Sequence, residues 1–169
     1  MLEGSSRRSR RAFIWVTTGL ALVVVAVCFA TSEDVLAGAV AATRYSARFS
    51  GLVMAAAVVA RAPRPVAWSM RRTELTLAFV AAHGVHLATV TLRALVEPAN
   101  KLRSFSIEVE LVVFLGFLLL ALLAATARAT SPTGRRANAI VFYVAWAVLA
   151  FASATRAPTF PRRRSCWSL

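Results

Sequence analysis

The feature that most constrains this chain is a series of long stretches without charged side chains. Residues 12–32, 75–92, 111–127 and 137–155 contain no Asp, Glu, Lys or Arg, and they are 21, 18, 17 and 19 residues long. A helix needs about 20 apolar residues to cross the hydrocarbon core of a bilayer. Because lipid offers backbone groups no hydrogen-bond partner, each such segment must be helical. The runs therefore predict an all-α, polytopic transmembrane helical bundle.

A fifth span is predicted in a region that is less apolar. Residues 49–60 carry no charge but are too short to cross a membrane alone. A helix that begins near Ala41 is long enough, provided that Arg44 and Arg48 extend their side chains to the headgroups. The alternative is a re-entrant or interfacial segment. The predicted organisation is a basic cytoplasmic N-terminus at 1–11, spans at about 12–32, 42–60, 74–95, 108–127 and 138–155, and a basic tail at 156–169.

The charge distribution supports a membrane location and argues against nucleic acid as a partner. The net charge of +13 and the pI near 11.8 are values common in nucleic-acid-binding proteins. The basic residues, however, lie at the edges of the apolar runs and not along one face or one tail. With 59% hydrophobic residues and a mean hydropathy of +0.66, the expected partner is the lipid bilayer and the expected location is the cell membrane.

The positions of the basic residues predict a cytoplasmic N-terminus, because Lys and Arg concentrate in cytoplasmic loops. The inner segments of a five-span chain hold 11 arginines before the tail, and the two outer loops hold 5 basic residues. The inner set is Arg7, Arg8, Arg10, Arg11, Arg61, Arg64, Arg71, Arg72, Arg128, Arg135 and Arg136, and the outer set is Arg44, Arg48, Arg93, Lys101 and Arg103. The tail departs from this pattern, since Arg156 and residues 162–164 then lie outside. Either the last segment does not fully cross, or the earlier helices fix the orientation, or a further helix is missing.

The first apolar run has a second interpretation. Residues 9–14 resemble the start of a twin-arginine export signal, and Cys28 and Ala30 are small residues in the spacing of a cleavage site. The run is longer than the 7–15 apolar residues of a typical signal peptide. We therefore expect a retained first span.

The two histidines are the candidate functional residues. His83 and His86 lie near the middle of the third predicted span, where ionisable groups are costly and usually functional. Their spacing places them on one helical face, and Gly84 between them leaves room for a flat cofactor or a neighbouring helix. Imidazole is an axial ligand of haem iron, and helical bundles hold cofactors in their interiors. Interhelical packing, proton relay and binding of another metal are the alternatives.

Geometry limits a haem site built from these residues. Two histidines three residues apart on one helix cannot ligate opposite faces of one porphyrin, and the chain contains only 2 histidines. Met54 is an alternative ligand, and Met70 lies at the cytoplasmic edge. A homodimer or a partner subunit is another source of a second histidine. Cys28 and Cys166 have no metal-binding spacing, and no nucleotide-binding or nucleophile motif occurs.

Residues 42–151 resemble the ferric reductase-like transmembrane family, which includes the haem-binding membrane subunit of periplasmic methionine-sulfoxide reductase. The matching segments are TRYSARFSGLVMAAAVVARAPRP, MRRTELTLAFVAAHGVHLATV and GRRANAIVFYVAWAVLAFA. In the family, a basic pair precedes the helix that carries a haem-ligand histidine. Arg71 and Arg72 match that pair, and His86 matches the ligand better than His83. A later helix of the family supplies the opposing histidine, where this chain has Asn138.

The resemblance implies haem b held by His86 or His83, and electron transfer across the bilayer with electrons from a separate reductase or from quinol. The rival hypothesis is a non-enzymatic accessory subunit or a degenerate paralogue without haem, which Asn138 and the cationic tail favour. A small transporter is the third hypothesis. It is the least supported, because no span has paired Gly/Pro breaks and no acidic residue lies at mid-depth.

Overall fold

The computed structural model describes residues 3–61, 72–96 and 107–155. These residues form five α-helices and no strands, which confirms the all-α prediction. The helices are α1 (Glu3–Ala30), α2 (Val35–Arg61), α4 (Arg72–Val96), α6 (Ile107–Thr126) and α7 (Pro132–Thr155). The basic tail at 156–169, Met70 and the residues at 62–71 and 97–106 lie outside the described residues.

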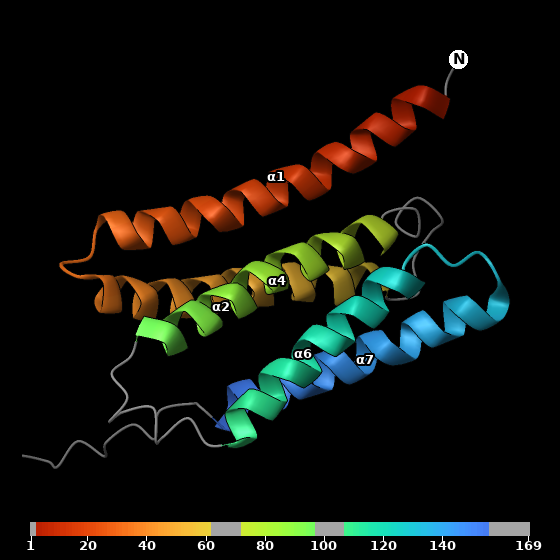
Figure 1. Ribbon diagram of the computed structural model, residues 1–169. Coiled ribbons are helices and arrows are strands. Elements are labelled where there is room, and N and C mark those ends of the chain that lie inside the picture. The colour runs from red at the N-terminus through yellow and green to blue at the C-terminus, as the bar shows by residue number, and fades with distance from the viewer. Residues whose placement is uncertain (1–2, 62–71, 97–106, 156–169) are drawn as a thin grey trace, which may run out of the picture.

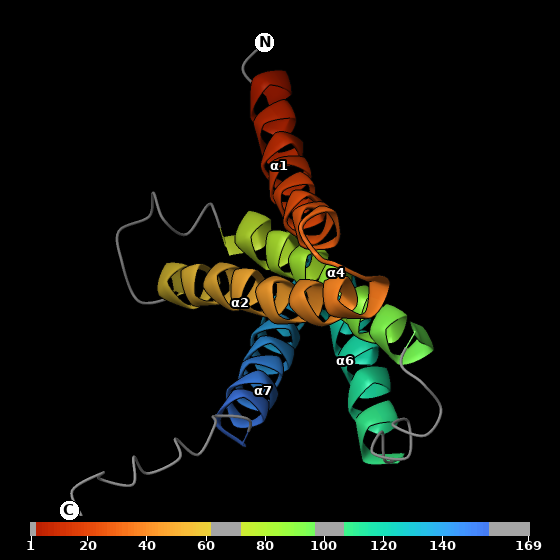
Figure 2. The same cartoon turned by 90° about the vertical axis from the view of Figure 1, so that its left-hand side faces the viewer.

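The helices are arranged in three layers (Figures 1 and 2). The α2–α4 pair forms the middle layer and has the most extensive contact of any helix pair. α1 lies across one side of this pair and contacts both of its helices. α6 and α7 lie on the other side, nearest to α2–α4 where α6 ends and α7 begins, and they move away toward the other end (Figures 1 and 2).

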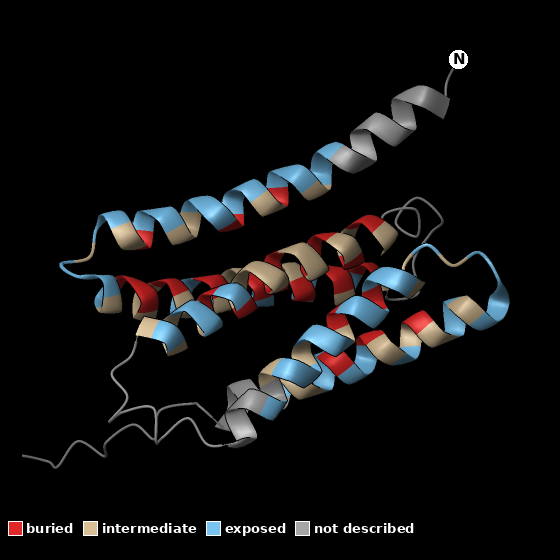
Figure 3. Cartoon of the chain, in the orientation of Figure 1, coloured by how far each residue is buried: buried red, intermediate tan, exposed pale blue. Residues whose placement is uncertain are grey.

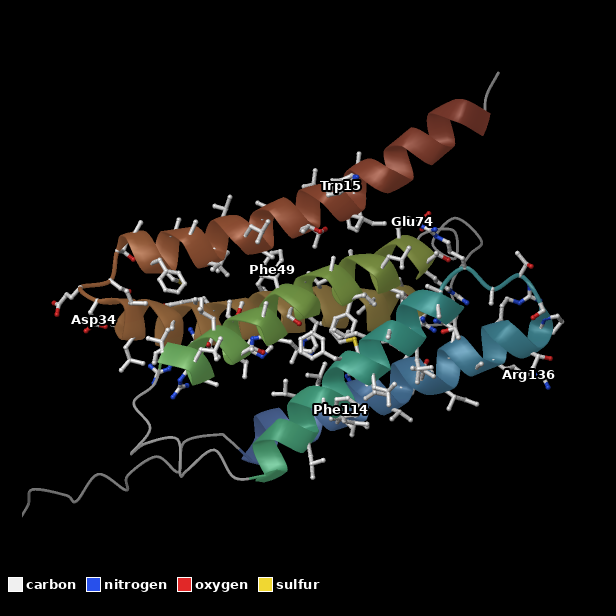
Figure 4. All side chains as sticks on the ribbon, viewed as in Figure 1. Trp15, Asp34, Phe49, Glu74, Phe114 and Arg136 are labelled. Atoms are coloured by element: carbon white, nitrogen blue, oxygen red, sulfur yellow. The ribbon has the colours of Figure 1, made fainter. Side chains whose placement is uncertain are left out.

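Short polar residues define where two of the helices begin. Asp34 precedes α2, and its Oδ1 accepts a hydrogen bond from the backbone N–H of Ala37 at 2.7 Å (Figure 4). Ser131 precedes α7, and its Oγ accepts from the N–H of Gly134 at 3.1 Å. Such side chains satisfy N–H groups that the first helical turn leaves without partners. Pro132 then occupies the first position of α7, where its missing N–H costs nothing.

The observed helices are longer than the predicted spans at their N-terminal ends. α2 begins at Val35 and not near residue 42, so it is one continuous helix of 27 residues. α1 begins at Glu3, so the basic segment expected to precede the first span is itself helical. Within the described residues, two helices are long and apolar enough to cross a membrane, at Ala12–Ala30 and Arg72–Val96, and Val113–Thr126 is a shorter apolar stretch.

The packing inside the bundle relies on small side chains. The fully or nearly fully buried residues of α2 and α4 include Ala39, Ala42, Ala57, Ala60, Ala78 and Ala82. Gly38 is required for the approach of α1, because a Cβ atom added there would lie 2.6 Å from Cδ1 of Phe29. Phe79, Leu123 and Phe142 supply the large buried side chains where α4, α6 and α7 meet.

Large apolar side chains are abundant among the exposed residues, and Figure 3 shows exposed residues in pale blue along α1 and α6. Trp15 on α1 and Phe114 on α6, both labelled in Figure 4, are 73% and 69% exposed. Buried residues in the same structure include Ser46, Ser50, Thr76, His83 and Asn138. Polar side chains are therefore gathered inside while much of the surface is apolar.

Candidate functional site: a cavity lined by histidine and arginine

A cavity of about 840 Å³ lies between α2, α4 and α7. Its lining residues on α7 lie in the second half of that helix, from Trp146 to Ala150. Both histidines of the chain line it from α4. α2 contributes Met54 and Ser50, and α7 contributes Trp146 together with Leu149 and Ala150. The predicted site residues are thus brought together on the wall of one cavity.

Serine side chains of α2 hold both imidazole rings. Ser50 Oγ lies 2.7 Å from His83 Nδ1, and Ser46 Oγ lies 3.1 Å from His86 Nδ1. The two serines are about one helical turn apart on α2, and the two histidines are about one turn apart on α4. Two serine–histidine contacts therefore lie side by side and join α2 to α4. Ser46 Oγ also lies 3.1 Å from Thr89 Oγ1, and Thr43 Oγ1 donates to the Thr89 carbonyl at 3.3 Å.

These contacts determine which ring nitrogen can bind a metal. With Nδ1 of His83 directed at Ser50, a metal ion in the cavity would be ligated through Nε2. In that tautomer Nδ1–H donates to the serine oxygen, an arrangement that orients metal-binding histidines in many proteins. His83 is also stacked on Phe79, with ring centroids 5.3 Å apart, and it is 7% exposed. The ring of His83 is therefore held on two sides.

Three arginines line the cavity, at the end of the bundle opposite Arg61, the last residue of α2. Arg44 and Arg48 project from α2, and Arg93 projects from the last turn of α4. Arg48 lies over the ring of Tyr45, with its guanidinium carbon 5.4 Å from the centroid. No acidic residue lines the cavity among the described residues. The combination of imidazole, apolar wall and cationic rim suits a ligand with an apolar body and an anionic edge.

A second polar cluster lies in the opposite half of the bundle. We call it the Arg61 cluster, and it consists of Arg61, Thr76, Thr126, Asn138 and Phe142. Arg61 Nη2 donates to Thr76 Oγ1 at 2.9 Å and to Asn138 Oδ1 at 2.8 Å. The guanidinium carbon of Arg61 lies 3.8 Å from the centroid of the Phe142 ring. Asn138 Nδ2 donates to Thr126 Oγ1 at 3.0 Å. One arginine and one asparagine thereby connect α2, α4, α6 and α7.

Asn138, at the position where the resemblance implies a second histidine ligand, is 9% exposed and belongs to the Arg61 cluster. It does not line the cavity; the α7 residues that do so begin at Trp146, two turns farther along the helix. The asparagine has its own structural role, because it provides an acceptor for a partly buried guanidinium.

Sequence reasoning did not identify Ser46, Ser50 or Arg61 as part of a site. A signal existed for the serines, since Ser46 and Ser50 are spaced by one turn in an Ala-rich helix that faces the histidine helix. Among the described residues, no group of three or more His, Cys, Asp and Glu side chains could hold a bare metal ion. Haem differs in needing only one or two axial protein ligands.

No family model, no curated protein and no solved structure matches this chain.

Proposed function

We propose that this chain is a multi-pass membrane protein that binds haem b in the cavity between α2, α4 and α7 and takes part in electron transfer. The proposal includes five spans and a cytoplasmic N-terminus, with the Arg61 cluster on the inner side and the three cavity arginines on the outer side. Electrons would come from a separate reductase or from quinol. The observation that carries the proposal is the pair of serine-held histidines on the wall of a cavity that three arginines also line.

The distribution of polar and apolar side chains supports the membrane assignment. Water-soluble monomers rarely expose contiguous large apolar patches, yet exposed Val, Leu, Phe, Tyr and Trp residues occur on α1, α2, α6 and α7. In lipid, helices associate through small residues and interhelical polar contacts, which matches the buried alanines and the serine–histidine pairs. α1 contacts α2 and α4, with Thr17, Ala21 and Cys28 buried, which favours a retained span over a cleaved leader.

The residues present fit haem b in size and chemistry. The cavity volume falls within the range of roughly 300–1,000 Å³ that is typical of small-molecule and cofactor sites. His83 or His86 would bind the iron through Nε2. Arg44, Arg48 and Arg93 would hold the two carboxylates at one edge of the porphyrin, because guanidinium groups pair well with carboxylates. Haem, when bound, supplies an iron that alternates between the ferrous and ferric states.

The chain's own residues would perform three tasks around this cofactor. Ser50 and Phe79 orient the His83 ring, and Ser46 orients His86. Leu149 and Met54 exclude water from the buried side of the cavity. The Arg61 cluster keeps α7 attached to α2 and α4 at the closed end, which fixes the cavity's dimensions. The reduction potential of the haem would then depend on its burial and on the hydrogen bonds to the ligand histidine.

A second candidate function is a membrane accessory protein without haem. The serine–histidine pairs favour it, because interhelical hydrogen bonds of this kind stabilise a bundle with or without a cofactor. Asn138, which is engaged by Arg61, is compatible with both candidates.

The visible spectrum of the detergent-solubilised protein distinguishes the two candidates. The protein is produced in cells supplied with haem precursor, and is compared with His83→Ala, His86→Ala and a matched control, Thr91→Val, on the same helix. Thr91 is exposed and bonds only to its own helix. We expect a Soret band that shifts on reduction with dithionite, persists in Thr91→Val and disappears in the variant that lacks the ligand. A monodisperse but colourless wild-type protein contradicts the haem proposal and supports the accessory function.

A further inference from the structure

We infer that this cavity provides one protein ligand to the haem iron, from α4, and leaves the opposite face of the haem open to a small diatomic molecule such as carbon monoxide. The inference rests on the proposed function and adds a ligand class to it: the site binds an exogenous neutral molecule and does not only pass electrons.

All the imidazole in the site comes from one wall. His83 and His86 are the only histidines in the chain, and their ring centroids lie 5.3 Å apart on the same face of α4. The Nδ1 atoms of both rings are paired with serines of α2, so neither ring can rotate to the far side of the cavity without breaking such a contact. Two residues one turn apart cannot sit on opposite faces of the same porphyrin. One histidine at most can therefore bind the iron of a given haem.

The α7 residues described in the cavity wall include no group that ligates haem iron. These residues are Trp146, Leu149 and Ala150. The indole nitrogen of Trp146 is a hydrogen-bond donor only, and the other two side chains are aliphatic.

Among the described residues of the cavity wall, Met54 is the one side chain besides the histidines that has a soft donor atom. It is 3% exposed and belongs to the buried apolar cluster that includes Phe79 and Leu123. Its neighbours on α2 are Ser50, one turn earlier, and Ala57, which packs in the same cluster. We therefore assign Met54 to the apolar core and not to the coordination sphere.

The surroundings of the open position indicate its ligand class. Among the described residues that line the cavity, Met54 and Ala55 of α2 and Trp146, Leu149 and Ala150 of α7 present mostly apolar side chains. Apolar walls favour small neutral molecules over charged ones, because a charged molecule would lose its hydration there. A neutral diatomic that binds ferrous iron matches both the size and the polarity.

The test is the addition of carbon monoxide to the dithionite-reduced, purified full-length protein. We expect a high-spin spectrum before addition and a sharpened, blue-shifted Soret band afterwards, with full conversion of the haem at one equivalent of bound gas. Met54→Leu is the matched variant, since it keeps the volume and removes the sulfur. We expect the same spectra and the same carbon monoxide response from it as from the wild type.

Two results overturn the inference while leaving haem binding intact. The first is a low-spin, six-coordinate wild-type spectrum that does not change with carbon monoxide. The second is a carbon monoxide response that appears only in Met54→Leu, which would make the methionine the second ligand. A preparation without any Soret band overturns the proposed function as well, so the failure of the two claims is distinguishable.

Discussion

Ser50 and Ser46 offer a paired test of which histidine binds the cofactor. Ser50→Ala removes the Nδ1 partner of His83, and Ser46→Ala removes that of His86. The shorter contact to its serine favours His83 as the ligand, although its position matches the family pattern less well than that of His86. Loss of a hydrogen-bond partner of a metal-binding histidine typically lowers affinity about 10–100-fold. In haem titrations of the purified protein, we expect this loss in Ser50→Ala and a smaller one in Ser46→Ala. The reverse order would identify His86.

Asn138 is the residue for which the structure changes the interpretation most. The resemblance treats it as a lost haem ligand, whereas the structure places it in the Arg61 cluster, away from the cavity. Asn138→Leu would leave Arg61 with one acceptor fewer in a partly buried place. The expected cost is about 1–3 kcal/mol of stability, measured as thermal unfolding in detergent, with haem content unchanged in the fraction that remains folded.

The variant Asn138→His tests directly whether position 138 faces the haem or belongs to the Arg61 cluster. If position 138 faces the haem, Asn138→His would restore a second axial ligand and convert the spectrum to a low-spin, six-coordinate form. We expect no such conversion, because α7 reaches the cavity only from Trp146 onward. A low-spin spectrum from Asn138→His would contradict the placement of α7 described above.

How far the candidate site follows from sequence depends on the residue. His83 and His86 could be predicted, because two ionisable groups in an apolar run are conspicuous on any hydropathy plot. Their partners Ser46 and Ser50 could not, since a serine in a membrane helix often bonds to its own backbone and only the register between α2 and α4 decides otherwise. The role of Arg61 required the ends of four helices to be brought together.

At the scale of single helices, α2 shows why boundaries are harder to predict than spans. The length that a span requires predicts a start near Ala41, but the N-terminal cap at Asp34 allows the helix to begin at Val35. The extra turns bring Gly38 against Phe29 of α1. Charged residues inside the helix, Arg44 and Arg48, obscure the pattern in the sequence because they face the cavity.

The contact between α1 and α2 gives a prediction at this scale. A Cβ atom at Gly38 would lie 2.6 Å from the Phe29 ring and 3.3 Å from the Phe29 Cα, so α1 would have to shift. We expect Gly38→Ala to lower stability by about 1–3 kcal/mol, as overpacking commonly does. Gly51→Ala is the matched control on the same helix, because nothing lies within 4 Å of its Cβ position. Differential scanning fluorimetry in detergent compares the two; equal or higher stability of Gly38→Ala would show that α1 does not pack this closely.

At the scale of the whole molecule, the all-α architecture is confirmed, and two helices meet the length and apolarity required to cross a membrane. Five spans stay a prediction. Among the described residues, α2 carries two arginines in its centre and α7 begins with two, so hydropathy alone does not separate spanning helices from interfacial ones. The distinction depends on whether the arginines reach the headgroups or face the cavity.

The topology can be measured with reporter fusions. An alkaline phosphatase domain, active only outside the cytoplasm, is fused after Arg61 and, separately, after Thr155. Five spans with an inner N-terminus predict a low signal from the first fusion and a high signal from the second. A low signal from both fusions would show that α7 does not cross and that the chain has four spans. A high signal after Arg61 would contradict the assigned orientation of α1 and α2.

The central claim is that the cavity between α2, α4 and α7 holds haem, and the haem content of the purified protein tests it most directly. The measurement is the ratio of haem to polypeptide, obtained as the pyridine haemochrome of monodisperse protein in detergent. We expect about one haem b per chain, because both histidines of the chain line the same cavity. A ratio close to zero after production with excess haem precursor, in protein that is folded and monodisperse, would contradict the claim.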